Sequence, residues 1–172
     1  MITEKFKAKI ESGLGGVVIF AGSGSDKPHI DILAENLKLY EIPFEVRVVS
    51  AHKQSKKLTD LIREYDALRG DIVYIAVAGG TDALSGVLSY HSLRLTISCP
   101  PDHPNLSCIN NPKGSSNVYI GRPENAARAV AQIFSEKNLQ LTSHLEGEMK
   151  AKRNALEYAD SELLREYSEG QK

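Results

Sequence analysis

The sequence predicts an α/β protein in which about five parallel strands form a doubly wound sheet within a three-layer sandwich. Short apolar runs alternate along the chain with segments whose apolar residues recur at helical spacing. The run at 16–22 is continuous rather than alternating, which is typical of a strand buried on both faces of a parallel sheet. Right-handed crossovers through the helices then place helices on both sides of that sheet.

The expected strands are short, apolar and separated by turn residues. They span 16–22, 44–49, 72–78, 95–99 and 118–121. Residues 102–117 are rich in Asn, Pro, Ser and Gly, a composition that predicts a loop. Pro100 and Pro101 predict a rigid turn ahead of this loop and allow one cis peptide bond there.

Four helices are expected to alternate with the strands, at 27–40, 56–65, 83–92 and 123–137. Pro28 suits a first helical turn, and Asp26 before it is a candidate cap. Sparse apolar positions in a highly charged segment predict one or two amphipathic helices over 143–170. We therefore expect an α/β domain at 1–140 and a helical extension at 141–172. The extension is expected to pack on a neighbouring subunit, and a solvated terminal helix is the alternative.

Composition excludes several classes of protein. The formal net charge of −1 gives no general reason to expect nucleic acid or a membrane as partner. Residues 1–13 are charged and do not form a signal peptide, and no apolar run approaches the roughly 18 residues of a membrane span. Cys99 and Cys108 lie nine apart and indicate neither a zinc site nor a redox pair, although a disulfide is possible on spacing alone. The expected location is a reducing cytoplasm.

The segment from Gly22 to Asp26 is the first candidate site, because it joins a buried strand to a helix start. Its glycines permit a tight turn, and Ser23 and Ser25 add hydroxyls beside free helix-start amides. Such a loop cradles a phosphate or another anion. Asp26 would repel phosphate but can accept hydrogen bonds from ribose hydroxyls. The structural alternative is a simple capped turn.

The second candidate, Ser50-Ala51-His52-Lys53, directly follows the second strand. Histidine gives and takes protons near neutral pH, and the neighbouring lysine suits a phosphate. A third segment, Ala78 to Asp82, follows the third strand, and its two glycines permit close approach to a flat ligand. Thr81 or Asp82 is alternatively the cap of the next helix. Ser98 to Pro101 follows the fourth strand, so all four segments fall at one edge of the sheet.

These motifs resemble the phosphoribosylaminoimidazole carboxylase (PurE) family. Its members carry a GSxSD loop, matched at 22–26, a Glu-Val-Arg-Val-Val-Ser-Ala-His segment, matched at 45–52, and an Ala-Gly-Gly or Ala-Gly-Arg turn, matched at 78–80. The likeness covers roughly residues 16–135 and implies a flavodoxin-like, three-layer fold. The Lys53 that follows His52, the SCPP at 98–101 and the ALSG at 83–86 resemble the direct (class II) carboxylases rather than the mutases.

The resemblance implies that 5-aminoimidazole ribonucleotide (AIR) takes up CO2 at carbon 4 to give 4-carboxyaminoimidazole ribonucleotide (CAIR). His52 would shuttle the proton of carbon 4. The resemblance also implies which residues bind each part of the substrate. The phosphate would be bound by Ser23, Ser25, Ser50 and Lys53, and the ribose by Asp26. The base and the carboxyl group would lie against Ala78, Gly79 and Gly80, with Ala51 beside them. No metal or organic cofactor is implied. The family also implies a homo-oligomer, a tetramer or octamer.

Two departures leave the carboxyl donor open. Residues 80–82 read Gly-Thr-Asp where direct carboxylases have Arg-Ser-Asn, and residues 109–113 lack a family arginine, replaced by Asn110. Three alternatives therefore remain. They are a mutase that uses the N5-carboxylated substrate, a related enzyme for another ribonucleotide, and a nucleotide sensor without activity. Retention of His52 argues against the sensor, because a pure binder needs no proton shuttle.

Overall fold

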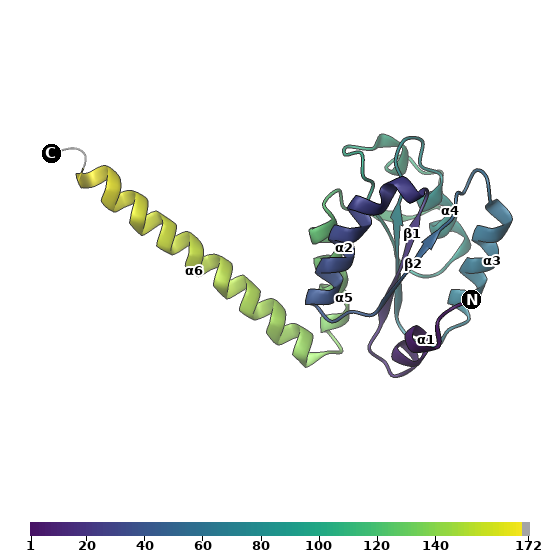
Figure 1. Ribbon diagram of the computed structural model, residues 1–172, viewed down its shortest axis with the longest axis horizontal. Helices are drawn as coiled ribbons and strands as arrows, with labels where there is room; N and C mark the ends of the chain where they lie inside the picture. The colour runs from purple at the N-terminus through teal and green to yellow at the C-terminus, as the bar shows by residue number, and fades with distance from the viewer. Residues whose placement is uncertain (170–172) are drawn as a thin grey trace. The chain divides into compact units, whose positions relative to one another are not determined.

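A computed structural model describes residues 1–169, and its core is a five-stranded parallel sheet (Figure 1). The strands are β1 (Gly16–Ala21), β2 (Phe44–Val48), β3 (Ile72–Val77), β4 (Thr96–Ser98) and β5 (Asn117–Tyr119). They lie in the order β2-β1-β3-β4-β5, and every neighbouring pair is parallel. The predicted doubly wound sheet is confirmed. Its strand order reverses between β1 and β3, the switch point at which such sheets bind ligands.

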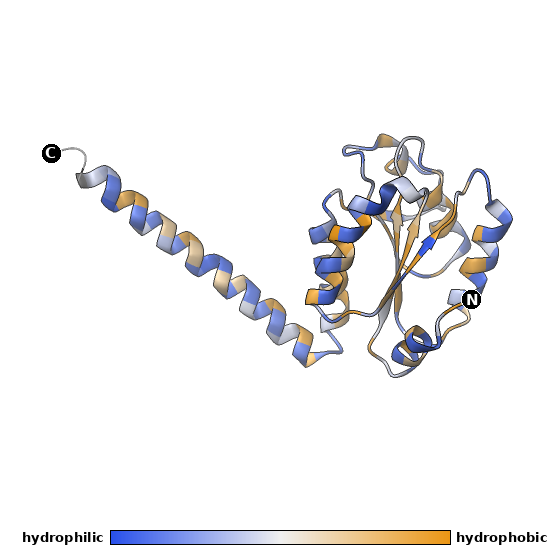
Figure 2. Ribbon diagram, viewed as in Figure 1, coloured by the Kyte–Doolittle hydropathy of each residue, from blue (hydrophilic) through white to orange (hydrophobic). Residues whose placement is uncertain are grey.

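Helices cover both faces of the sheet. They are α1 (Glu4–Glu11), α2 (Lys27–Leu39), α3 (Ser55–Asp66), α4 (Leu84–His91) and α5 (Pro123–Ser135), with short 3-10 turns η1 (Gly24–Asp26) and η2 (Leu106–Cys108). Figure 1 shows α2 and α5 together on one face, while α1, α3 and α4 lie on the other. Figure 2 shows the strands as mostly apolar ribbons, with a hydrophilic stretch on one of them, between helices of mixed hydropathy. This amphipathic pattern is what the helical spacing predicted.

An aromatic cluster fills the core between the sheet and α3. The ring of Phe20 on β1 meets the rings of Tyr65 and Tyr74 edge to face, at centroid distances of 6.0 and 5.3 Å. All three side chains are fully buried. The Tyr65 hydroxyl donates to Glu45 Oε2 at 2.5 Å, and the Tyr74 hydroxyl donates to Asp66 Oδ1 at 2.6 Å. The cluster therefore buries large apolar rings while each hydroxyl keeps a charged acceptor.

The first helix was not predicted from the sequence. The Thr3 side chain accepts from the Phe6 amide and caps α1, and Phe6 and Ile10 are buried four residues apart. A Cβ on Gly16 would lie 2.4 Å from Ile10 Cδ1 and 3.0 Å from the Pro43 carbonyl oxygen, so β1 and α1 pack closely at this glycine. The Thr3 cap and the Phe6–Ile10 spacing were the available signals.

Residues from Ser135 onward form a second compact unit, which contains one long helix, α6 (Leu139–Glu169). The predicted C-terminal helix is therefore present, and residue 170, its expected end, lies outside the described residues. Several of its large apolar side chains are exposed: Met149, Leu156, Tyr158, Leu163, Leu164 and Tyr167. That this helix packs on a neighbouring subunit stays a prediction.

Two local predictions are wrong. Asp26 precedes α2 but its side chain makes no cap there, because η1 intervenes and turns the carboxylate back toward Ser23. The cis peptide lies at His103–Pro104 rather than at Pro100 or Pro101. Cys99 and Cys108 are both buried and free, so they form no disulfide. No helix within residues 1–169 is long and apolar enough to cross a membrane.

Candidate functional site

A cavity of about 330 Å³ lies at the carboxyl ends of β1, β2 and β3, and we call it the strand-end cavity. Loops after β1, β2 and β3 line it with Gly22, Ser23, Ser25, Asp26, Ser50, Ala51, His52, Lys53, Ala78, Gly79, Thr81, Asp82, Ala83 and Leu84. Every residue given a role from the sequence is among them except Gly80, which lies between two lining residues of the same turn. The roles themselves stay predictions.

The loop after β1 is shaped by its own side chains. Ser23 Oγ accepts from the Ser25 amide at 3.2 Å, and Asp26 Oδ2 accepts from the Ser23 amide at 2.9 Å. Both serines are more accessible than Asp26, which is only 8% exposed. Burial raises the pKa of the Asp26 carboxyl above its ordinary value, and the Ser23 amide partly offsets this effect. This loop therefore combines the accessible hydroxyls of Ser23 and Ser25 with the buried carboxylate of Asp26.

The loop after β2 presents the candidate proton shuttle. The Gln54 amide donates to the Ser50 carbonyl at 2.8 Å, and the Lys53 amide lies 3.3 Å from Ser50 Oγ. This tight turn leaves His52 and Lys53 exposed at the cavity. Within residues 1–169 the His52 ring has no hydrogen-bond partner, so both of its nitrogens are free to meet a ligand.

The loop after β3 passes close to the loop after β1. A Cβ on Gly22 would lie 3.2 Å from the Ala78 Cβ, so a larger residue would push the two loops apart. Gly80 has a φ of 65°, which favours glycine. Asp82 Oδ1 accepts from the amides of Leu84 and Ser85, and Oδ2 accepts from Ser85 Oγ. The Asp82 side chain therefore accepts from the first two amides of α4, while the N-cap position itself is Ala83, one residue after the two alternatives left open by the sequence.

Four lining residues, Thr81, Asp82, Ala83 and Leu84, had no predicted role in ligand binding. They closely follow the Gly79-Gly80 turn and lead into α4, and that position was the available signal. The segment at 98–101 does not line the cavity. Burial raises the pKa of the Cys99 thiol to about 12, and burial raises the pKa of the Cys108 thiol to about 11. Neither thiol is an ionised nucleophile at neutral pH.

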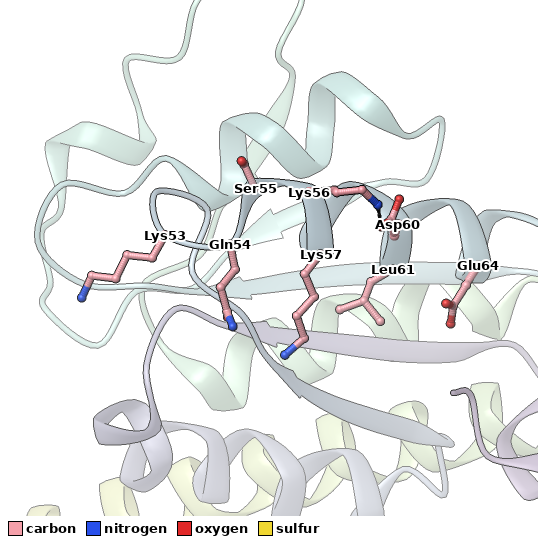
Figure 3. Close-up of a pocket in the computed structure, with 8 residues that line it drawn as sticks. All are labelled: Lys53, Gln54, Ser55, Lys56, Lys57, Asp60, Leu61 and Glu64. Carbon is pink, nitrogen blue, oxygen red and sulfur yellow. Dashed lines mark hydrogen bonds and ion pairs between the residues drawn. The ribbon is translucent and has the colours of Figure 1, made fainter.

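A second hollow, of about 630 Å³, runs along α3 and shares only Lys53 with the strand-end cavity (Figure 3). Its wall carries an exposed ion pair, Lys56 to Asp60 at 2.6 Å, of the kind common on helix surfaces. Apart from Lys53, it contains none of the residues of the first three candidate segments. In the part of the chain that the structure describes, no three His, Cys, Asp or Glu side chains are placed to hold a metal ion.

Known proteins share both the sequence and the fold of this chain. The family model described as AIR carboxylase matches residues 16–155. The chain belongs to the AIR carboxylase family. The phosphoribosylaminoimidazole carboxylase of Treponema denticola is 32% identical over 155 residues, which cover 87% of this chain and 98% of the relative. That of Archaeoglobus fulgidus is 33% identical over 85% of this chain and 83% of the relative.

The fold of the AIR carboxylase family is also matched directly. A crystal structure of Treponema denticola PurE superposes with a TM-score of 0.82 at 32% identity, covering 87% of this chain and 98% of that one. The resemblance deduced from the GSGSD, SAHK and AGG motifs is thereby confirmed. In this AIR carboxylase family member, those three motifs line the strand-end cavity together.

Proposed function

We propose that this protein carboxylates AIR with CO2 to give CAIR, in purine biosynthesis, with His52 as the proton shuttle. The observation that carries the proposal is the strand-end cavity, which gathers hydroxyls, one lysine, one buried carboxylate and one histidine from the loops after β1 and β2. Membership of the AIR carboxylase family supports the same substrate class.

The parts of the cavity divide by the chemistry of the ribonucleotide. The hydroxyls of Ser23, Ser25 and Ser50 and the ammonium of Lys53 suit its phosphate. The Asp26 carboxylate suits the ribose hydroxyls. The Ala78-Gly79 backbone then lies beside the flat imidazole, because glycine permits close approach.

The reaction requires one bond to form and one proton to leave. Carbon 4 of the electron-rich aminoimidazole attacks the carbon of CO2, and a carbon–carbon bond forms. The proton on the resulting tetrahedral carbon 4 then passes to an imidazole nitrogen of His52, which restores the aromatic ring. The protein's main task is to hold both reactants in register and exclude water.

The likeness of residues 50–53, 83–86 and 98–101 to the direct carboxylases supports CO2 as the donor, and the charge near the β3 loop does not choose between the donors. The cavity wall there consists of Ala78, Gly79, Thr81 and Asp82, and its only charged side chain is a carboxylate. Asp82 is 7% exposed, so water screens it weakly. The carboxylate of an N5-carboxylated substrate and that of the CAIR product would both meet this charge, so it acts on either reaction. The mutase reaction is the outcome to distinguish.

A forward assay without ATP tests the proposed reaction. Purified protein is mixed with AIR in buffer rich in CO2, and CAIR is followed by ultraviolet absorbance. We expect CAIR formation above a protein-free control. If no CAIR forms while calorimetry still detects AIR binding, the carboxylase proposal is wrong, and N5-carboxylated AIR is tested next as the mutase substrate.

The proposal includes a homo-oligomer, a tetramer or octamer, and a cytoplasmic location. Light scattering measures the assembly, and a monomer would contradict it.

Asp26→Asn is expected to lower the affinity for AIR while maintaining or raising the stability of the fold. A carboxyl whose pKa is raised by folding costs stability when ionised, and this cost is present above the folded pKa and vanishes below the ordinary value of 3.8. The asparagine oxygen still accepts from the Ser23 amide. The melting temperature at pH 7 should therefore equal or exceed that of the wild type, with a gap that narrows toward pH 4. Affinity for AIR should fall about tenfold, because a charged acceptor for ribose is lost.

Melting curves at pH 7 and pH 4, with calorimetric titration of AIR, measure both effects. Asp31→Asn is the matched control, because Asp31 lies exposed on α2 and pairs only with Lys27 in the described contacts. It should leave affinity for AIR unchanged. A lower melting temperature for Asp26→Asn at pH 7 would contradict the expected gain in stability.

A further inference from the structure

The turn from Gly79 to Asp82 is held by side chains from the loop that follows β4. The Gly80 amide donates to Asp102 Oδ2 at 2.6 Å, and the Gly80 carbonyl accepts from Asn105 Nδ2 at 2.9 Å. The Asp82 amide donates to Ser107 Oγ at 2.8 Å. One departure from the family sequence, residues 80–82, therefore lies within one hydrogen-bond network, and the other, residues 109–113, begins two positions after Ser107. We call Asp102, Asn105 and Ser107 the loop clamp.

Asn105 is the centre of the loop clamp. Its side-chain nitrogen donates one hydrogen to the Gly80 carbonyl and the other to Asp102 Oδ1, at 2.9 and 3.0 Å. Its side-chain oxygen accepts from the Ser107 amide at 3.0 Å and lies 2.5 Å from Ser107 Oγ. Asn105 is only 5% exposed, so each of these bonds is shielded from water. An amide has two donors and two acceptor positions, and here all four have partners.

The loop clamp is anchored on the edge of the sheet. The backbone N–H of Asn105 lies 3.3 Å from the Tyr119 hydroxyl on β5. The His103 ring stacks on the Tyr119 ring at a centroid distance of 5.7 Å. The contacts therefore run from β5 through Asn105 to Gly80. Gly79, Thr81 and Asp82 on either side of Gly80 line the strand-end cavity.

We propose that Asn105 is a positioning residue for carboxyl transfer, which acts by holding the Gly79–Asp82 turn against the imidazole and CO2. The inference rests on the proposed function. In the proposed function the phosphate and ribose meet the loops after β1 and β2, with which the loop clamp makes none of the hydrogen bonds described above. Burial is the main cause of the raised pKa of the Asp26 carboxyl, and Asp102 acts on that carboxyl only through its charge, as a minor contribution. Loss of Asn105 should therefore affect the use of CO2 far more than the binding of AIR.

Asn105→Asp is the sharpest test, because aspartate has nearly the same shape. It removes both N–H donors and sets a carboxylate beside the Asp102 carboxylate and the Gly80 carbonyl, which repel it. We expect kcat/KM for CO2 to fall at least about tenfold, while the Kd of AIR by calorimetry stays within about twofold. Asn36→Asp is the matched control: Asn36 bonds only the Ile32 carbonyl of its own helix through its side chain in the described contacts, and its kinetics should stay near wild type.

The double variant Asn105→Asp with Asp102→Asn is a partial rescue. The side-chain amide introduced at position 102 can donate to the new carboxylate and still accept from the Gly80 N–H. Part of the lost kcat/KM for CO2 should therefore return. Equal loss of AIR binding and CO2 use in Asn105→Asp, or unchanged kinetics, overturns the positioning role. Amide hydrogen exchange at Gly80 and Asp82, measured by NMR, is independent of activity. If the wild-type protein is inactive, the proposed function fails, and faster exchange at both amides in Asn105→Asp still decides whether the clamp holds the turn.

Discussion

His52→Asn is expected to lower kcat for CAIR formation by about 10²- to 10⁴-fold, the range that a positioned acid or base contributes. Asparagine keeps a polar side chain of similar reach but cannot accept and release a proton near neutral pH. His52 is exposed and its ring makes no hydrogen bond within residues 1–169, so its removal leaves the fold of the loop intact. The Kd of AIR should stay within about tenfold, because the phosphate and ribose contacts are untouched. Steady-state kinetics and calorimetry measure the two quantities separately.

His91→Asn is the matched control for this variant. His91 ends α4 outside the strand-end cavity, and its exposed ring meets only that of Tyr90 in the described contacts. Turnover should be unchanged. An equal loss of AIR binding and turnover in His52→Asn would mean that the histidine binds substrate instead of moving the proton.

Phe20→Ala is expected to lower the free energy of unfolding by about 3–5 kcal/mol, the usual cost of removing a buried phenyl ring. The ring of Phe20 fills the space between Tyr65 and Tyr74, and neither tyrosine can move inward without breaking its hydroxyl bond to Glu45 or Asp66. The cavity therefore cannot collapse easily. Urea unfolding, followed by circular dichroism, measures the change.

Leu39→Ala is the control for core packing, because Leu39 is 66% exposed at the end of α2. Its substitution should change stability by no more than about 0.5 kcal/mol. A loss below about 1 kcal/mol for Phe20→Ala would show that the aromatic cluster repacks, contrary to the geometry of its hydroxyl bonds.

The strands and the helices α2 to α5 were predictable because their signals are local. A run such as Gly16–Ala21 is buried at every position, and its unbroken apolar sequence is typical of a strand covered on both faces. The neighbourhood of Ser23, His52 and Gly79 was also predictable, since parallel strands bring their carboxyl ends to one edge. The resemblance to the family then implied a role for each of these residues, which the alternation of strands and helices alone does not indicate.

Other features depend on contacts between residues distant in the chain. Asn105 lies 25 positions from Gly80, and nothing in the composition of its loop predicts that its amide bonds that carbonyl. Similarly, α1 has only two buried residues, Phe6 and Ile10, so its apolar pattern is short. Asp26 misled for a different reason. An aspartate at this position can either cap the following helix or close a 3-10 turn. Here its carboxylate accepts from the backbone N–H of Ser23, which closes the turn.

The lengths of the strands have a consequence for how such an enzyme can diverge. β1, β2 and β3 have five or six residues each, whereas β4 and β5 have three. The loops proposed to hold the ribonucleotide follow the longer strands β1 and β2, whereas the Gly79–Asp82 turn is held by side chains from the loop between the two shortest strands. We therefore expect substitutions in that loop to change the use of the carboxyl donor more readily than they change nucleotide binding.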